Sequence, residues 1–258
     1  MRNGSGLLAN TPTVVKNLVI INAIMLLVKY LGKGQLLGFH MDTVLGLHYI
    51  SSPEFKPWQL VTHLFMHGNF WHLFMNMFGL FMLGAPLEYR WGSKRFLLYY
   101  FICGIGAALL YMGVQGWNYH ELALTLTPEN LALVKSQGPQ AMMDLYMGGV
   151  GFDNTAMNDL AILLFTDLVG ASGAVFGILV AFGMLYPNAE LMIFPLPIPI
   201  KAKYFVILYG AYELYAGYAQ QAGLAGHQGD NVAHFAHIGG LIVGFITIMI
   251  WKRRLPDT

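Results

Sequence analysis

Five polar side chains stand out because they lie within stretches that are otherwise apolar: Ser172, His237, His234, His72 and Asn76. A polar group at membrane depth costs up to a few kcal/mol unless it has a partner, so such residues are functional candidates. A serine hydroxyl within reach of an imidazole is the pairing that nucleophilic catalysis requires. Nearby imidazole and amide groups can supply hydrogen bonds to an oxyanion.

The stretches that carry these residues are long enough to cross a membrane. Of the 258 residues, 56% are hydrophobic and 10% are charged, against roughly 25% charged in an ordinary soluble domain. About 20 apolar residues span the hydrocarbon layer. Six segments meet or approach this length: Val14 to Leu31, Phe70 to Leu87, Phe96 to Val114, Leu168 to Pro187, Tyr204 to Ala219 and Val232 to Trp251. The sequence therefore predicts an all-α polytopic membrane protein with six transmembrane helices.

Basic residues indicate the direction of the spans, because short cytoplasmic loops are enriched in Lys and Arg. With the N-terminus inside, the inner side carries ten of the 14 basic residues: Arg2, Lys16, Arg90, Lys94, Arg95, Lys201, Lys203, Lys252, Arg253 and Arg254. We therefore expect both termini in the cytoplasm. The short chain and the lack of an organelle-targeting extension favour the inner membrane of a bacterium.

The domain organisation expected from these spans is simple, and its parts are a short cytoplasmic N-terminal segment (1–13), one six-helix membrane domain (14–251), and a cytoplasmic C-terminal tail (252–258). Two outer loops of the membrane domain are long, 32–69 and 115–167. Trp58 in the first loop favours a position in the headgroup region. In the second loop, Thr127 is expected to cap a short helix within a flexible connection.

The polar residues of the spans share one depth. The second, fourth and sixth spans all begin on the outer side, and His72, Asn76, Ser172 and His237 lie two to six residues past those beginnings. At about 1.5 Å per residue this is roughly 3–9 Å below the helix starts. Small residues around Ser172 and after His237 allow the fourth and sixth spans to pack closely. A serine and a histidine from different spans could then come within hydrogen-bond distance.

Each of these residues also has an ordinary structural explanation when it is taken alone. A serine in a spanning helix usually bonds to a carbonyl of its own helix. A single buried histidine is more often an interhelix hydrogen-bond partner than a catalyst, and Cys103 fits a small buried apolar residue. It is the joint occurrence at one depth that favours a catalytic site. Nucleic acid is excluded as a partner, because the net charge is only +1 and no long basic run is present.

The same residues lie in four motifs that together resemble the rhomboid family of intramembrane proteases. The motifs are Trp58 to His63 leading into His67 to Asn76, Gly84 to Gly92, Gly170 to Gly177, and Ala233 to Gly240. Their order and spacing are similar to those of the family over nearly the whole chain, except for the first dozen residues and the long second outer loop. The resemblance implies a six-helix rhomboid-like bundle.

The resemblance also implies roles for single residues. Ser172 would be the nucleophile and His237 its general base, without a third acidic member, while His72 and Asn76 would help to stabilise the oxyanion. Phe176, where relatives often have tyrosine, would pack on the catalytic histidine. The substrate would be a transmembrane segment of another protein in the lipid bilayer, entering beside the fifth span, and neither a cofactor nor a metal ion is required.

Other residues of the motifs have structural or open interpretations. Glu88 and Arg90 are expected to form a structural cap or an ion pair rather than to take part in catalysis, and His234 is expected to pack locally. A metalloprotease is the nearest enzymatic alternative, because His63 and His67 have the i, i+4 spacing of paired metal ligands. However, the residues between them lack the glutamate that the His-Glu-x-x-His motif needs as its base.

Two further alternatives remain from other classes of protein. A transporter could use the intramembrane histidines and Glu213 as a proton relay, although the chain lacks repeated halves. A non-cleaving relative that binds membrane helices would lack the serine or the histidine, and both are present here. Nothing in the sequence indicates an oligomeric state.

Overall fold

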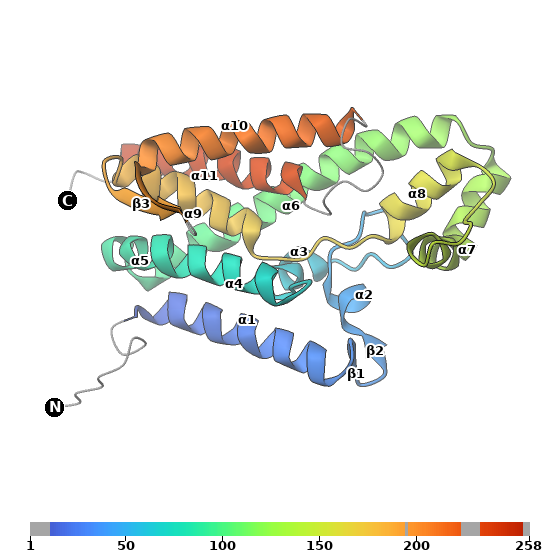
Figure 1. Ribbon diagram of the computed structural model, residues 1–258, viewed down its shortest axis with the longest axis horizontal. Coiled ribbons are helices and arrows are strands. Elements are labelled where there is room, and N and C mark those ends of the chain that lie inside the picture. The colour runs from blue at the N-terminus through green and yellow to red at the C-terminus, as the bar shows by residue number, and fades with distance from the viewer. Residues whose placement is uncertain (1–10, 194–195, 223–232, 255–258) are drawn as a thin grey trace.

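The computed structural model describes residues 11–193, 196–222 and 233–254. Long helices run side by side along one direction, and α7 (Pro128–Tyr146) and α8 (Thr155–Phe165) lie beyond one end of the bundle (Figure 1). The helices of the bundle are α1 (Thr13–Leu31), α4 (Phe70–Gly79), the π-helical turn η2 (Leu80–Gly84), α5 (Ala85–Trp91), α6 (Ser93–Leu124), α9 (Ser172–Leu185), α10 (Ala202–Gln221) and α11 (His234–Arg254). The fold is therefore the all-α polytopic bundle that the apolar pattern predicts.

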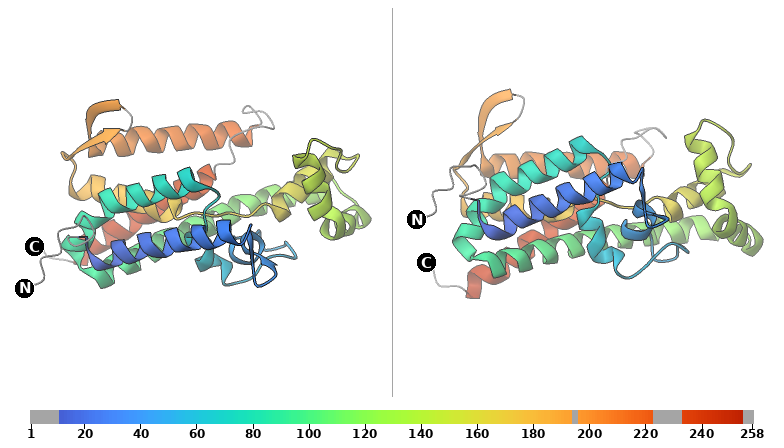
Figure 2. Two further views of the ribbon diagram at one scale, coloured as in Figure 1. Left: turned by 60° about the horizontal axis from the view of Figure 1, so that its bottom comes forward. Right: turned by 90° about the horizontal axis from the view of Figure 1, so that it is seen from below.

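Four of the described helical segments are long and apolar enough to cross a membrane: Thr13–Leu31, Phe70–Trp91, Ser93–Leu124 and His234–Lys252. The other two predicted spans correspond to α9, which has only 14 residues, and to α10, which has 20 residues but is less apolar. The beginning of α1 and the end of α11 lie at the same end of the bundle (Figure 2).

The remaining elements connect these helices. They are β1 (Gln35–Leu36), β2 (Phe39–His40), α2 (Met41–Leu45), α3 (Gln59–Thr62), the 3-10 turn η1 (His63–Phe65), α7 (Pro128–Tyr146), α8 (Thr155–Phe165), β3 (Glu190–Ile193) and β4 (Leu196–Lys201). The two strand pairs are short antiparallel hairpins, β1 with β2 and β3 with β4. The first outer loop thus contains short helices, and Trp58 donates its indole N–H to the carbonyl of Val44 at 2.9 Å.

The long second outer loop is far more helical than the sequence predicts. Thr127 does cap a helix, because its hydroxyl accepts a hydrogen bond from the amide of Asn130 at 3.2 Å. However, that helix, α7, has 19 residues and continues through Pro139. The expectation of a short helix in a flexible connection is wrong, because α7 packs against α8 around a separate apolar cluster that includes Val134, Leu160 and Leu164.

The start of the fourth span also differs from the prediction. Residue Leu168 does not belong to a helix; it forms a two-residue antiparallel bridge with Leu47, with amide-to-carbonyl distances of 2.9 and 2.8 Å. The helix α9 begins only at Ser172. This places Ser172 in the first turn of its helix rather than one turn inside it.

The carboxylate of Glu88 is a structural cap, as predicted from the sequence. It is almost fully buried and accepts hydrogen bonds from the amides of Val14 and Val15 at 2.9 and 2.8 Å. These amides belong to the first turn of α1, where amides lack a carbonyl partner within the helix. It also accepts a hydrogen bond from the hydroxyl of Ser93 at 2.6 Å. Glu88 therefore ties the beginning of α1 to the junction of α5 and α6.

Candidate active site

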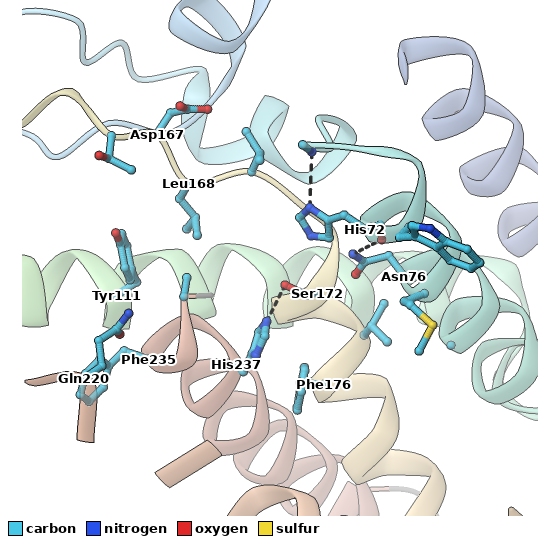
Figure 3. A pocket seen from close by; sticks show the side chains of 18 of the residues that line it. His72, Asn76, Tyr111, Asp167, Leu168, Ser172, Phe176, Gln220, Phe235 and His237 are labelled. Carbon is cyan, nitrogen blue, oxygen red and sulfur yellow. Dashed lines mark hydrogen bonds between the residues drawn. The ribbon is translucent and has the colours of Figure 1, made fainter. Parts of the chain in front are cut away.

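Ser172 and His237 lie at hydrogen-bond distance from each other. The hydroxyl oxygen of Ser172 is 2.9 Å from the Nε2 atom of His237 (Figure 3). Ser172 comes from the N-terminal end of α9, and His237 lies in the first turns of α11. The serine hydroxyl and the imidazole can therefore exchange a proton directly.

Close packing of α9 against α11 explains how the two side chains meet. A side-chain carbon at Gly240 would overlap the carbonyl oxygen of Gly173, and one at Gly244 would lie 2.7 Å from the Cα atom of Gly177. Only glycine allows the two backbones to approach this closely. The Tyr99 hydroxyl of α6 lies 2.9 Å from the carbonyl oxygen of Gly177 and 3.0 Å from that of Gly244. It therefore links α6 to both helices of the site.

The segment before Ser172 requires glycine for another reason. Gly170 has a φ of +122°, a conformation that other residues rarely adopt. A side-chain carbon there would also lie 2.7 Å from the Nε2 atom of His72. The Gly170 amide donates a hydrogen bond to the carbonyl of His63 at 2.9 Å. This turn brings the backbone just before Ser172 against the imidazole of His72.

The side chains of His72 and Asn76 come from α4 and line the same cavity as Ser172. The Gly68 amide donates to the Nδ1 atom of His72 at 3.4 Å. Because Nδ1 accepts, the Nε2 atom of a neutral His72 carries the proton and is a donor. Asn76 donates one amide hydrogen to the carbonyl oxygen of His72 at 2.9 Å, which leaves its second hydrogen for another acceptor. The two side chains thus offer donors on one side of Ser172 (Figure 3).

The ring of Phe176 stacks on the ring of His237. Their centroids are 4.2 Å apart and the planes differ by 13°. Phe176 also contacts the ring of Tyr209 from α10, with centroids 5.0 Å apart. This packing restricts rotation of the imidazole, and it does not depend on a hydroxyl at position 176.

Glu213 and His234 are the residues whose arrangement the sequence does not predict. The buried Oε2 atom of Glu213 lies 2.7 Å from the Nδ1 atom of His234 and 3.0 Å from the Nδ1 atom of His237. His234 therefore pairs with a residue of α10 instead of packing locally. The three side chains are also of types that can hold a metal ion, and their ligand atoms lie within 4.8 Å of one another. The distances to the carboxylate, however, are those of hydrogen bonds and ion pairs.

His63 and His67 do not form a pair of ligands on one helical face. The 3-10 turn that contains His63 ends at Phe65, before His67. The Nδ1 atom of His63 donates to the carbonyl of Gln59 at 2.8 Å, and burial lowers the pKa of His63 from 6.5 to about 4. Both imidazoles are nearly inaccessible to solvent. The spacing that suggests a metalloprotease therefore has a structural origin.

Acidification is expected to destabilise the protein through His67. Burial lowers its pKa from 6.5 to about 3, with additional repulsion from His72 and Lys29. Between these two values the unfolded chain binds a proton at this position and the folded chain does not. Stability is therefore complete above about pH 6.5 and falls as the pH drops, by about 1.4 kcal/mol per pH unit for one histidine. Melting temperatures in detergent at about pH 7.5 and about pH 5 measure this loss.

A comparison of two variants isolates this contribution. His67→Gln should show a smaller decrease in melting temperature between the two pH values than the wild type, because one buried imidazole is removed. His40→Gln makes the same chemical change at an exposed position and should retain the full decrease. Equal decreases in melting temperature in His67→Gln and in the wild type would show that the loss of stability at low pH does not arise from His67.

The candidate site opens into a cavity of about 2140 Å³. Ser172, His237, His72 and Asn76 all line this cavity. Much of its remaining wall is apolar and comes from α4, η2 and α10: Trp71, Met75, Phe78, Met82, Phe205 and Tyr209. Figure 2 shows α10 standing away from α4, on the far side of the bundle from α1. The cavity is therefore bounded by α4 and α10, which do not pack closely against each other.

The fold is a polytopic helical bundle, and a serine and a histidine from neighbouring helices meet at one cavity. These two features define the protein as a helical membrane protein with a Ser–His pair. Residues 54–254 match the family described as "Rhomboid domain". This match covers most of the chain, so the protein belongs to the rhomboid family. The resemblance in the sequence motifs is thereby confirmed.

Curated relatives agree with this assignment. The chain is 28% identical to "Rhomboid protein 1, mitochondrial" of Saccharomyces cerevisiae over 187 residues, which are 72% of this chain and 40% of the yeast protein. It is 29% identical to "Rhomboid protease AarA" of Providencia stuartii over 188 residues, 72% of this chain and 53% of that protein. A 64-residue match to "Rhomboid-like protease 3" of Toxoplasma gondii is 39% identical and covers 25% and 24% of the two chains. The chain thus matches about half or less of the length of these relatives.

Proposed function

We propose that this protein is an intramembrane serine endopeptidase that cleaves transmembrane segments of other membrane proteins through Ser172 and His237. The observation that carries the proposal is the 2.9 Å contact between the Ser172 hydroxyl and the His237 Nε2 atom at the cavity wall. Membership of the rhomboid family, with relatives named as proteases, supports the same reaction.

In the proposed mechanism, His237 takes the Ser172 proton while the serine oxygen attacks the substrate carbonyl carbon. The oxyanion is held by the Ser172 amide together with His72 and Asn76. The first amides of α9 lack carbonyl partners within the helix, and the positive end of the helix dipole favours negative charge there. His237 then protonates the leaving amine, and water hydrolyses the acyl-enzyme.

The proposed path of the substrate runs between α4 and α10. A transmembrane helix keeps its carbonyls in internal hydrogen bonds, so it must unwind locally before it can be cut. The apolar wall formed by side chains such as Trp71, Met75 and Phe205 suits a lipid-soluble segment. The polar end near Ser172 suits the unwound backbone and water. The bacterial inner membrane, with cytoplasmic termini, remains the proposed location.

Incubation of the reconstituted protein with a panel of single-span substrates tests this proposal. We expect cleavage by the wild type and labelling of Ser172 by a fluorophosphonate, both absent in Ser172→Ala. Glu129→Gln, which changes an exposed carboxylate at the beginning of α7, is the control and should cleave normally. Cleavage by a purified Ser172→Ala protein would refute the proposal.

A further inference from the structure

We infer that Glu213 is a positioning residue for His237 and completes a Ser–His–Glu arrangement across three helices. This inference rests on the proposed function. The carboxylate of Glu213 is 1% exposed, and its Oε2 atom lies 3.0 Å from the His237 Nδ1 atom. The opposite ring atom of His237, Nε2, faces the Ser172 hydroxyl. The imidazole is thus placed between a nucleophile and a buried acid.

The tautomer of His237 explains why a partner at Nδ1 matters. For Nε2 to accept the serine proton, the proton of the neutral ring must be on Nδ1. That atom is buried and has no aligned hydrogen-bond partner among the described residues. The carboxylate of Glu213 lies within ion-pair distance of it but off the direction of a hydrogen bond. The carboxylate can only accept a hydrogen bond, and it lies beside the buried N–H of Nδ1. It therefore favours the tautomer of His237 that the reaction needs.

Charge gives the contact a second effect during the reaction. When His237 takes the serine proton, the ring becomes a cation 3.0 Å from the Glu213 carboxylate. Two opposite charges attract more strongly in a poorly polarisable interior than in water. The carboxylate consequently stabilises the imidazolium more than the neutral ring, and so lowers the barrier to proton transfer. In serine proteases with a triad, a buried aspartate has this function.

The side chain of His234 explains how Glu213 is held in place. A buried carboxylate is costly unless it is hydrogen-bonded. The Nδ1 atom of His234 lies 2.7 Å from Glu213 Oε2, the same oxygen that faces His237. The two histidines are three residues apart on α11, so both rings face α10. His234 therefore fixes the position of the acid, and the acid in turn orients the ring of His237.

The test compares Glu213→Gln and Glu213→Asp with Glu129→Gln, which makes the same change at an exposed carboxylate. For Glu213→Gln we expect a kcat about 10²-fold lower, with a KM close to that of the wild type, because the residue acts in proton transfer and does not touch the substrate. The loss should be smaller than the 10⁴-fold seen when the acid of an aligned triad is neutralised. Glu213→Asp keeps the charge and should recover a measurable part of kcat, while Glu129→Gln should be unchanged.

A double-variant comparison separates positioning from a merely structural role. If Glu213 acts through His237, adding Glu213→Gln to His237→Ala should cause no further loss of activity. The labelling rate of Ser172 by a fluorophosphonate should fall in Glu213→Gln, and the melting temperatures of Glu213→Gln and Glu213→Asp report whether both variants fold.

Several results would overturn the inference. They are an unchanged kcat in Glu213→Gln, a kcat loss explained by unfolding without recovery in Glu213→Asp, and a further loss on top of His237→Ala. Activity that is removed by a chelator and restored by zinc would assign the three residues to a metal ion instead. The proposed function fails separately, if Ser172→Ala or His237→Ala still cleaves. Full activity of Glu213→Gln together with inactive Ser172→Ala and His237→Ala would overturn this inference alone.

Discussion

His237→Ala is expected to reduce the cleavage of a single-span substrate to the level of Ser172→Ala, a loss of about 10⁴–10⁶-fold in kcat. Without the imidazole, the Ser172 hydroxyl loses the base that now lies 2.9 Å away. The serine oxygen then remains protonated and a poor nucleophile. Initial cleavage rates in liposomes, measured at saturating substrate, give the change in kcat.

The double variant Ser172→Ala/His237→Ala provides the sharper measurement. Since the two groups act in one step, the double variant should be no less active than either single variant. His40→Ala, which removes an exposed imidazole, should keep wild-type activity. Multiplied losses in the double variant, or substantial cleavage by His237→Ala, would show that the two residues do not work as a pair.

The sequence predicts the bundle and a similar depth for these residues because both follow from membrane physics, while their pairing is implied by the family resemblance. Apolar length determines which segments can span a bilayer, and alternation of direction then determines depth. Small residues such as Gly173 and Gly240 indicate where two helices approach closely. Apolar length and alternating direction therefore place Ser172 and His237 at a similar depth, although Ser172 lies nearer to the start of its helix than the sequence predicts.

Features that depend on contacts between distant segments could not be predicted in this way. The beginning of α9 at Ser172 results from the bridge between Leu47 and Leu168, which lie 121 positions apart. In α7, the Gly138 and Pro139 pair reads locally as a turn. The helix nevertheless continues, because the missing side chain at Gly138 gives room to the ring of Phe165 in α8. Local propensity is here overridden by packing.

The role of Glu213 could not be predicted for a related reason. Its position in an apolar stretch marks it as a candidate functional residue. Whether it serves a proton relay or a catalytic histidine depends on which face of α10 meets α11. The rotation of α10 about its own axis is set by side-chain packing along both helices, and it cannot be inferred from the hydropathy of the segment.

His72→Ala and Asn76→Ala are each expected to lower kcat by about 10²–10³-fold while KM changes little. Both side chains present N–H donors to the cavity beside Ser172. Charge develops on the substrate oxygen only in the transition state, so these donors stabilise that state more than bound substrate. Steady-state cleavage of one reconstituted substrate measures kcat and KM for each variant.

Phe74→Leu is the matched control, because Phe74 belongs to the same helix, is 40% exposed and is not among the residues that line the cavity. It should cleave as the wild type does. If His72 and Asn76 bind the same oxyanion, their double variant should lose less than the product of the single losses, because removal of one donor already misplaces the oxygen. A larger KM with an unchanged kcat in either single variant would contradict this role. It would mean that the side chain binds the substrate helix equally in the ground state and in the transition state. Oxyanion stabilisation would then depend on the Ser172 amide.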